Sequence, residues 1–154
     1  MARIALVTGG TRGIGKAIVQ RLREDGYAVA AGYSGNDEAA AATAAELGVM
    51  VVKGNVGSFD DCARAVQAVE AELGPIDILV NNAGVQYPQK SISDISPEQL
   101  FKTFNVNILS MFHLTQAVIP HMQEGDSIIN TTSITSYHGH DELIDYSSTK
   151  GAIT

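Results

Sequence analysis

Short runs of β-branched and aliphatic residues alternate with stretches of helical character along this 154-residue chain. Five of the runs are typical of strands: Ile4 to Thr8, Ala28 to Tyr33, Val49 to Asn55, Ile76 to Asn81 and Ser127 to Thr132. Each is mostly apolar, as expected for a strand that helices cover on both faces. The alternation therefore predicts an α/β fold with a doubly wound parallel sheet.

Four helical units are expected between these strands. The first, Gly13 to Asp25, places its apolar residues on one stripe. The second is expected to begin after a cap at Asn36 and to end at Gly48. Ser58 with Asp61 marks the start of the third, and Ser96-Pro97 marks the start of the fourth. The last unit runs to about Pro120, with a break near Asn107.

Composition excludes several classes of protein. The chain has 17 acidic and 10 basic residues, and this net charge of −7 disfavours nucleic acid or an anionic membrane as a partner. The single cysteine, Cys62, excludes an internal disulfide and suits a reducing cytoplasm. Its helical spacing with Val66, Val69 and Leu73 predicts a buried structural thiol. No apolar run is long enough for a membrane span, so we expect one globular domain over residues 1–154.

A glycine-rich segment, Thr8 to Gly15, follows the first predicted strand directly and leads into the first helix. Glycines let a backbone turn tightly and approach a pyrophosphate, and a helix N-terminus offers unpaired N–H groups. A tight turn without a ligand is the alternative. The cofactor contacts expected in this segment are Gly9, Thr11, Arg12, Gly13, Ile14 and Gly15.

Ser133, Tyr146 and Lys150 can form a proton-donating site beside a bound dinucleotide. Ser133 follows the fifth strand, at the edge where open α/β sheets bind ligands, and Tyr146 and Lys150 share one face of the next helix. Reduction of a ketone requires a proton on the carbonyl oxygen. An ammonium nearby favours the phenolate form of a tyrosine, so Lys150 can tune Tyr146. Ser133 would hydrogen-bond the carbonyl oxygen as its charge develops.

Together these motifs resemble the short-chain dehydrogenase/reductase family over residues 1–154. The family carries T-G-x-x-x-G-x-G, then N-N-A-G after the fourth strand, then Ser and Tyr-x-x-x-Lys. The resemblance implies a nicotinamide cofactor contacted by Asn82, Ala83 and Gly84, and a small-molecule carbonyl substrate. It also implies that Tyr146 is the proton donor and that Tyr146 and Lys150 both contact the cofactor, with Lys150 on the nicotinamide ribose.

The resemblance gives Asn107 a role too. In the family an asparagine at this place holds a water that links the lysine to solvent, so Asn107 joins the expected catalytic residues. The neighbouring Asn105 is expected to have no function. A helical asparagine that merely faces water is the alternative for Asn107.

NADP(H) is expected in preference to NAD(H). The second strand ends in Gly32-Tyr33-Ser34, without the acid that an NAD-binding unit usually places there. In the family, a basic residue at the position of Arg12 is associated with binding of the 2′-phosphate; a solvated surface arginine is the alternative. Tyr33 is a further expected cofactor contact, and Asn55-Val56 matches the family's adenine-contacting pair, usually Asp-Val. Asparagine keeps an acceptor for the adenine amino group.

The substrate stays open among a ketoacyl thioester, an aldehyde and a sugar. The chain up to about Gly84 looks most like acetoacetyl-CoA and 3-oxoacyl reductases. Val85 to Gln89 and Asn130 to Tyr137 resemble aldehyde or sugar reductases related to glucose dehydrogenase, so a hybrid sequence is a hypothesis. His138 and His140 form an H-x-H, but no acid or cysteine completes a ligand spacing, and no metal site is expected.

Family members have about 250 residues in one domain. The chain would then hold five of the usual seven strands of a Rossmann fold and stop within the helix that carries Tyr146 and Lys150. We expect a homodimer or homotetramer for the full-length protein, and a poorly active, aggregation-prone polypeptide for residues 1–154 alone. The alternatives to an NADPH-dependent carbonyl reductase are a nucleotide-binding domain without catalytic activity and an interaction protein that has kept the fold.

Overall fold

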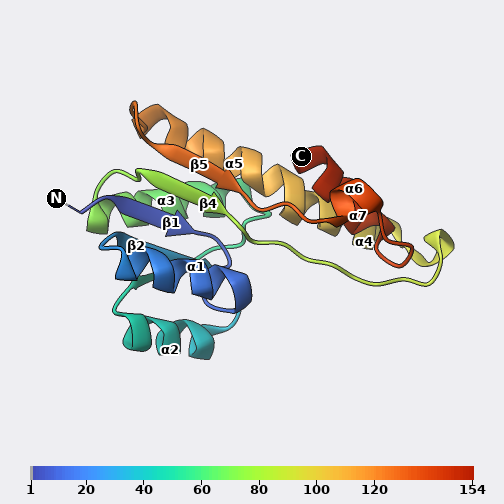
Figure 1. The fold of residues 1–154 in the computed structure, drawn as a ribbon, viewed down its shortest axis with the longest axis horizontal. Helices are drawn as coiled ribbons and strands as arrows, with labels where there is room; N and C mark the ends of the chain where they lie inside the picture. Colours follow the sequence, from blue (N-terminus) through green and yellow to red (C-terminus); the bar gives the residue numbers. More distant parts are fainter. Residues whose placement is uncertain (1) are drawn as a thin grey trace.

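A five-stranded parallel sheet runs through the computed structural model, which describes residues 2–154 (Figure 1). Its order is β3-β2-β1-β4-β5, and every neighbouring pair is parallel. The strands are β1 Ile4–Val7, β2 Ala28–Tyr33, β3 Met50–Lys53, β4 Ile78–Asn81 and β5 Ser127–Asn130. The predicted doubly wound sheet is confirmed. β3 ends before the predicted Asn55 because the N–H of Asn55 turns to the carboxylate of Asp61.

Helices connect the strands in the expected places. The α-helices are α1 Gly13–Glu24, α2 Asp37–Leu47, α3 Phe59–Leu73, α4 Pro97–Phe104, α5 Ser110–Val118, α6 Thr135–His138 and α7 Ile144–Ile153. Short 3₁₀ turns occupy Ile92–Asp94 and Ile119–His121. Between α4 and α5 lies a π-helical turn, Asn105–Leu109, so the predicted break near Asn107 is confirmed.

The predicted caps form, with one difference. Asn36 accepts from the N–H of Ala39 at the start of α2, and Ser96 caps α4 in the same way. Ser58 accepts from the N–H of Asp61, as a capping box requires, but the N–H of Ser58 donates to the carbonyl of Asn55 and not to the Asp61 carboxylate. The Asp61 carboxylate accepts from the backbone of Asn55 instead, at 2.9 Å, and thereby shapes the loop after β3.

The two faces of the sheet bury separate apolar clusters. Alternate residues of β1 face opposite ways: Ile4 and Leu6 belong to one cluster, Ala5 and Val7 to the other. Side chains of α3 and α5 complete the first cluster, and those of α1 complete the second. Figure 1 shows α4, α6 and α7 gathered beyond the end of the sheet at which β1 and β4 finish.

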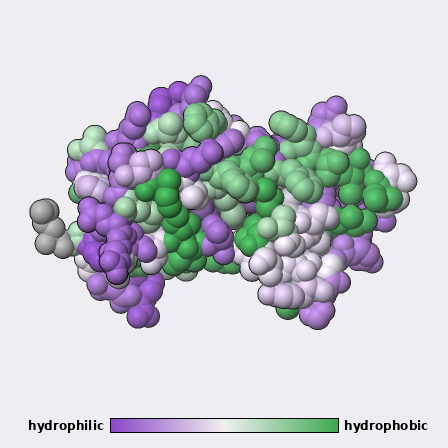
Figure 2. Space-filling model, turned by 90° about the horizontal axis from the view of Figure 1, so that it is seen from above, coloured by the Kyte–Doolittle hydropathy of each residue, from purple (hydrophilic) through white to green (hydrophobic). Residues whose placement is uncertain are grey.

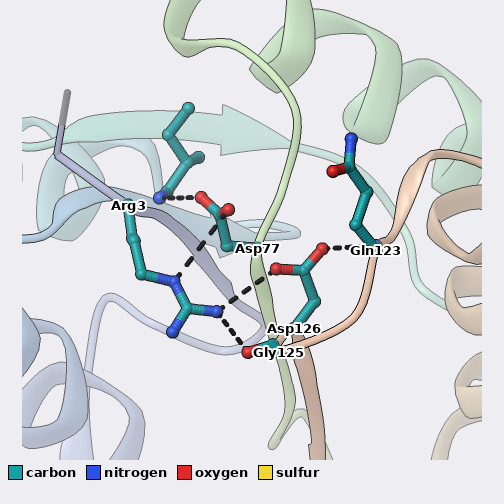
Figure 3. Close-up of polar contacts among 6 residues, drawn as sticks. Arg3, Asp77, Gln123, Gly125 and Asp126 are labelled. Carbon is teal, nitrogen blue, oxygen red and sulfur yellow. Dashed lines mark hydrogen bonds and ion pairs between the residues drawn. The ribbon is translucent and has the colours of Figure 1, made fainter.

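A polar cluster joins the amino ends of β1, β4 and β5 (Figure 3). The Arg3 guanidinium donates to the carbonyl of Gly125 at 2.7 Å and lies 3.2 Å from the carboxylate of Asp126. The N–H of Ile4 donates to the carboxylate of Asp77 at 2.6 Å. These contacts fix one end of the sheet, and the candidate site lies at the other.

The surface carries apolar side chains in several groups, some of which Figure 2 shows. Phe101 of α4 and Phe112 of α5 are 68% and 63% exposed. Among residues 2–154, no helix combines the length and the apolar character that a membrane crossing requires.

Cys62 provides a test of the packing of α3. Its thiol is buried, as predicted, and donates to the carbonyl of Val56 at 3.3 Å; burial raises the pKa of the thiol to about 11. In the native protein near pH 8, we expect an aromatic disulfide reagent to react with Cys62 at least about a hundredfold more slowly than in the unfolded chain, because the thiolate is scarce and enclosed. Absorbance of the released aromatic thiolate measures this. Equal rates with and without guanidinium chloride would contradict the packing.

Candidate functional site

The loops that follow β1 and β4 are joined through Thr8. Its hydroxyl oxygen accepts from the backbone N–H groups of Asn82 and Ala83, both at 2.9 Å. The Asn82 side-chain amide donates back to the carbonyl of Thr8 at 3.1 Å. In the sheet order, winding reverses between β1 and β4, and open α/β sheets bind their ligands outside the carboxyl ends of strands at such a point.

The glycines let α1 begin close to the loop after β4. A Cβ on Gly15 would lie 2.0 Å from the carbonyl oxygen of Gly9 and 2.7 Å from the Asn82 side chain. Gly13 has a φ of +51° and open space where a Cβ would stand. Within residues 2–154, no side chain caps the N-terminus of α1 at Arg12. Its first N–H groups thus stay available for an anionic group, which fits the pyrophosphate of a dinucleotide.

A cavity of about 650 Å³ begins at this glycine-rich segment. Every cofactor contact expected before residue 85 lines it, including Tyr33, Asn55, Val56 and Gly84. The volume is in the range of small-molecule sites.

At the end of β2, the structure shows an acid that is already paired. Asp37 accepts from the hydroxyl of Tyr33 at 3.0 Å and from the ammonium of Lys53 at 2.9 Å. The hydrogen bond from Lys53 holds the pKa of the Asp37 carboxyl below its usual value. Arg12 lines the cavity and is exposed, so a cation is available at the cavity while the nearby carboxylate is balanced by Lys53.

The loop after β3 is held by Asn105, to which the sequence analysis gave no function. The Asn105 amide donates to the carbonyl of Gly57 at 2.9 Å. Within the loop, the Asn55 side-chain oxygen accepts from the N–H of Gly57 at 3.0 Å. A carbonyl oxygen has two lone pairs, so Asn55 keeps one for an adenine amino group.

At the other end of the site, Lys150 and Tyr146 lie together as predicted. The ammonium of Lys150 lies 5.5 Å from the centre of the Tyr146 ring and donates to the carbonyl of Thr131 at 2.8 Å. The hydroxyl of Thr132 donates to the Lys150 carbonyl at 3.1 Å. Lys150 is 3% exposed, and burial lowers the pKa of its ammonium.

Asn107 is fully buried and joins three elements. Its side-chain oxygen accepts from the N–H of Val85 at 2.8 Å, and its amide donates to the carbonyl of Val85 at 2.9 Å and to the hydroxyl of Thr149 at 3.1 Å. A Cβ on Gly84 would lie 3.4 Å from the Asn107 oxygen and 3.9 Å from the Lys150 nitrogen. Both side-chain amide hydrogens of Asn107 are therefore used. A water that links Asn107 to Lys150 would have to donate its hydrogen bond to a carbonyl oxygen of Asn107.

Ser133 lies in the turn between β5 and α6. Its oxygen accepts from the N–H and the hydroxyl of Thr135, at 3.2 and 3.1 Å, so its own hydrogen is left to donate. The residue before it, Thr132, is bonded to α7. The lining of the cavity reaches Gly84 but does not include Ser133, Tyr146 or Lys150.

Asp145 was not identified from the sequence. It is 2% exposed, and one carboxylate oxygen accepts from the hydroxyl of Thr103 at 2.9 Å and from the amide of Gln99 at 3.1 Å. The other oxygen accepts from the N–H of Tyr146 at 2.9 Å. Asp145 thus ties α7 to α4 directly beside Tyr146. The only sequence signal was an acid in the first turn of a helix, which usually indicates no more than a favourable interaction with the helix dipole.

Comparison with known proteins points to one family. A family model described as short chain dehydrogenase matches residues 3–154. The chain is 47% identical over 156 residues to the uncharacterized oxidoreductase YhdF of Bacillus subtilis (strain 168), with 98% of this chain and 54% of that protein covered. It is 42% identical over 152 residues to acetoacetyl-CoA reductase of Shinella zoogloeoides, with 97% of this chain and 63% of that protein covered.

A solved structure gives the same result for the fold. The crystal structure of blue fluorescent protein from a metagenomic library, in complex with NADPH, matches with a TM-score of 0.92 and 32% identity. The match covers 98% of this chain and 64% of that one. The chain thus spans roughly half to two thirds of the length of the relatives it matches.

The buried carboxylate of Asp145 can be tested by its removal. We expect Asp145→Ala to lower the free energy of unfolding by about 2 kcal/mol, because the N–H of Tyr146 loses its partner and two charge-assisted bonds to α4 disappear. Urea titration measures this. The matched control is Asp141→Ala, whose side chain is 97% exposed. Equal stability of the two variants would show that the Asp145 contacts do not hold α7.

Proposed function

Since the chain belongs to the short chain dehydrogenase family, we propose that residues 1–154 form one domain, the cofactor-binding and catalytic part of an NADPH-dependent carbonyl reductase. The observation that carries the proposal is the pairing of Tyr146 with the buried Lys150 beside Gly84, a residue that lines the cavity. The similarity to a protein named acetoacetyl-CoA reductase and to a structure in complex with NADPH supports it.

The proposed chemistry divides the reaction between a hydride and a proton. The dinucleotide, when bound, supplies the hydride to the carbonyl carbon. The hydroxyl of Tyr146 gives its proton to the carbonyl oxygen, and the free hydroxyl hydrogen of Ser133 hydrogen-bonds the same oxygen. The product is an alcohol, and the tyrosine is left as a phenolate that solvent reprotonates.

Lys150 serves this chemistry through its position. Its ammonium lies near the Tyr146 ring and stabilises the phenolate that forms. The structure gives it one acceptor among residues 2–154, the carbonyl of Thr131, so two of its three hydrogens can bind ribose hydroxyls. Burial destabilises the charged form of Lys150, and the phenolate of Tyr146 would stabilise it again.

We assign the preference for NADP(H) to Arg12. Arg12 lines the same cavity as Tyr33, and the first acid after β2, Asp37, is paired with Lys53. A guanidinium binds a phosphate with two parallel hydrogen bonds, whereas ribose hydroxyls alone give it no charge to pair with. This proposal leaves the carbonyl substrate among ketoacyl thioesters, aldehydes and sugars.

The proposal includes a homodimer or homotetramer. Phe101 and Phe112, on α4 and α5, leave large apolar rings in solvent, and a second copy of the chain would cover them. A cytoplasmic location fits the one thiol, Cys62, which is buried and protonated.

A specific observation favours a second function, nucleotide binding without turnover by the 154-residue chain. The lining of the cavity does not include Ser133, Tyr146 or Lys150. Binding of NADPH without oxidation of it by any carbonyl compound is the expected behaviour in that case.

Tyr146→Phe tests the proton donor. We expect kcat to fall by about a hundredfold or more, because the proton donor is lost, while the Kd for NADPH stays within about twofold. Oxidation of NADPH should be followed with acetoacetyl-CoA, an aldehyde and a sugar as substrates. A variant as active as the wild type would contradict the assignment of Tyr146, and a wild type that binds NADPH but reduces none of them would favour the second function.

Arg12→Ala tests the preference for NADPH. The loss of a charged hydrogen-bond partner should raise the Kd for NADPH by about tenfold and leave the Kd for NADH unchanged. Arg23→Ala is the matched control, since Arg23 is an exposed arginine in the last turn of α1 and does not line the cavity. Equal losses for both nucleotides would show that Arg12 does not bind the 2′-phosphate.

A further inference from the structure

Three consecutive residues of the π-helical turn face the cofactor site or its loops. Asn105 binds the loop after β3 through the carbonyl of Gly57, at 2.9 Å. Val106 lines the cavity. Asn107 binds the loop after β4 through both backbone groups of Val85. One turn therefore contacts both loops between which a dinucleotide would lie.

The π-helical geometry accounts for this reach. The N–H of Ser110 donates to the carbonyl of Asn105, five residues earlier, so the turn is wider than an α-helical one. Such insertions are frequent at functional sites. Here the turn presents Asn105 to one loop and Asn107 to the other.

The loop at residues 55–57 depends on Asn105 for one of its contacts. Its other bonds are local: Asn55 accepts from Gly57 and donates to Asp61, both close in the chain. The bond from Asn105 comes from 48 residues away and joins this loop to the turn between α4 and α5. A Cβ on Gly57 would lie 2.5 Å from the Asn105 amide nitrogen, so the two residues approach as closely as only glycine allows.

We propose that Asn105 is a positioning residue for the adenine end of the cofactor. By holding the Gly57 carbonyl, it keeps Asn55 and Val56 at a set distance from Val106, and all three line the cavity. The inference rests on the proposed function, because adenine is expected in this cavity only if the cavity binds NADPH. The nicotinamide end does not depend on Asn105, since Asn107 and Thr8 hold the loop after β4.

The test uses 2′,5′-ADP, which carries the adenine end and lacks nicotinamide. In Asn105→Asp, an isosteric carboxylate faces the Gly57 carbonyl and cannot donate to it. We expect the Kd for 2′,5′-ADP in isothermal titration calorimetry to rise about tenfold in this variant and about fivefold in Asn105→Ala, the cost of one hydrogen bond or slightly more. The control is Gln116→Ala, an exposed amide on α5, with an unchanged Kd.

Calorimetry also separates positioning from a folding defect. A partly unfolded variant lowers the number of binding sites per chain, whereas a misplaced loop raises the Kd at an unchanged number of sites. Hydrogen exchange should quicken at the N–H groups of Asn55 and Gly57 and stay the same in β1 and β4.

The outcomes keep the two proposals apart. If the wild type does not bind 2′,5′-ADP, both the proposed function and this inference are contradicted. If the wild type binds it and Asn105→Asp binds it equally well, the inference alone is contradicted. A higher Kd with a full number of sites supports it.

Discussion

The hydroxyl of Thr8 makes the contact on which the site depends. It accepts from two consecutive N–H groups, those of Asn82 and Ala83, and so fixes the loop after β4 against the loop after β1. β1 and β4 are neighbours in the sheet, and each is covered on both faces, so their carboxyl ends cannot move apart without loss of the core. Gly15 lies so close to the carbonyl of Gly9 and the side chain of Asn82 that no Cβ fits there, so α1 begins directly against both loops.

Buried polar side chains position the part of the site that contains Tyr146 and Lys150. Asn107, Asp145, Thr149 and Lys150 are all nearly inaccessible, and side chains of the first three make hydrogen bonds to α4, the π-helical turn, the loop after β4 or their own helix. A buried polar group without a partner costs about 1 to 3 kcal/mol, so the bonds from Thr103 to Asp145 and from Asn107 to Thr149 restrict where α7 can lie. The position of Tyr146 relative to Gly84 thus results from several bonds, none of which involves the tyrosine ring.

Local sequence patterns predicted the strands, the caps at Asn36 and Ser96, the buried face of α3 and the break near Asn107. These features depend on residues a few positions apart, whose spacing is visible in the chain. Asn105 and Asp145 were missed because their partners lie 48 residues away, at Gly57, and 42 and 46 residues away, at Thr103 and Gln99. No local spacing distinguishes such an asparagine or aspartate from one that faces water. The prediction of a capping box at Ser58 was half right, since the Asp61 carboxylate accepts from the N–H of Asn55 and not from that of Ser58.

The most direct test of this account is a calorimetric titration of the purified chain with NADPH and, in parallel, with NADH. The account predicts saturable binding of one NADPH per chain and a weaker affinity for NADH, because the amides at the start of α1 and Arg12 offer a phosphate site that only NADPH fills completely. Failure of both nucleotides to bind at millimolar concentration would contradict the central claim that the loops at the carboxyl ends of β1 and β4 form a dinucleotide site.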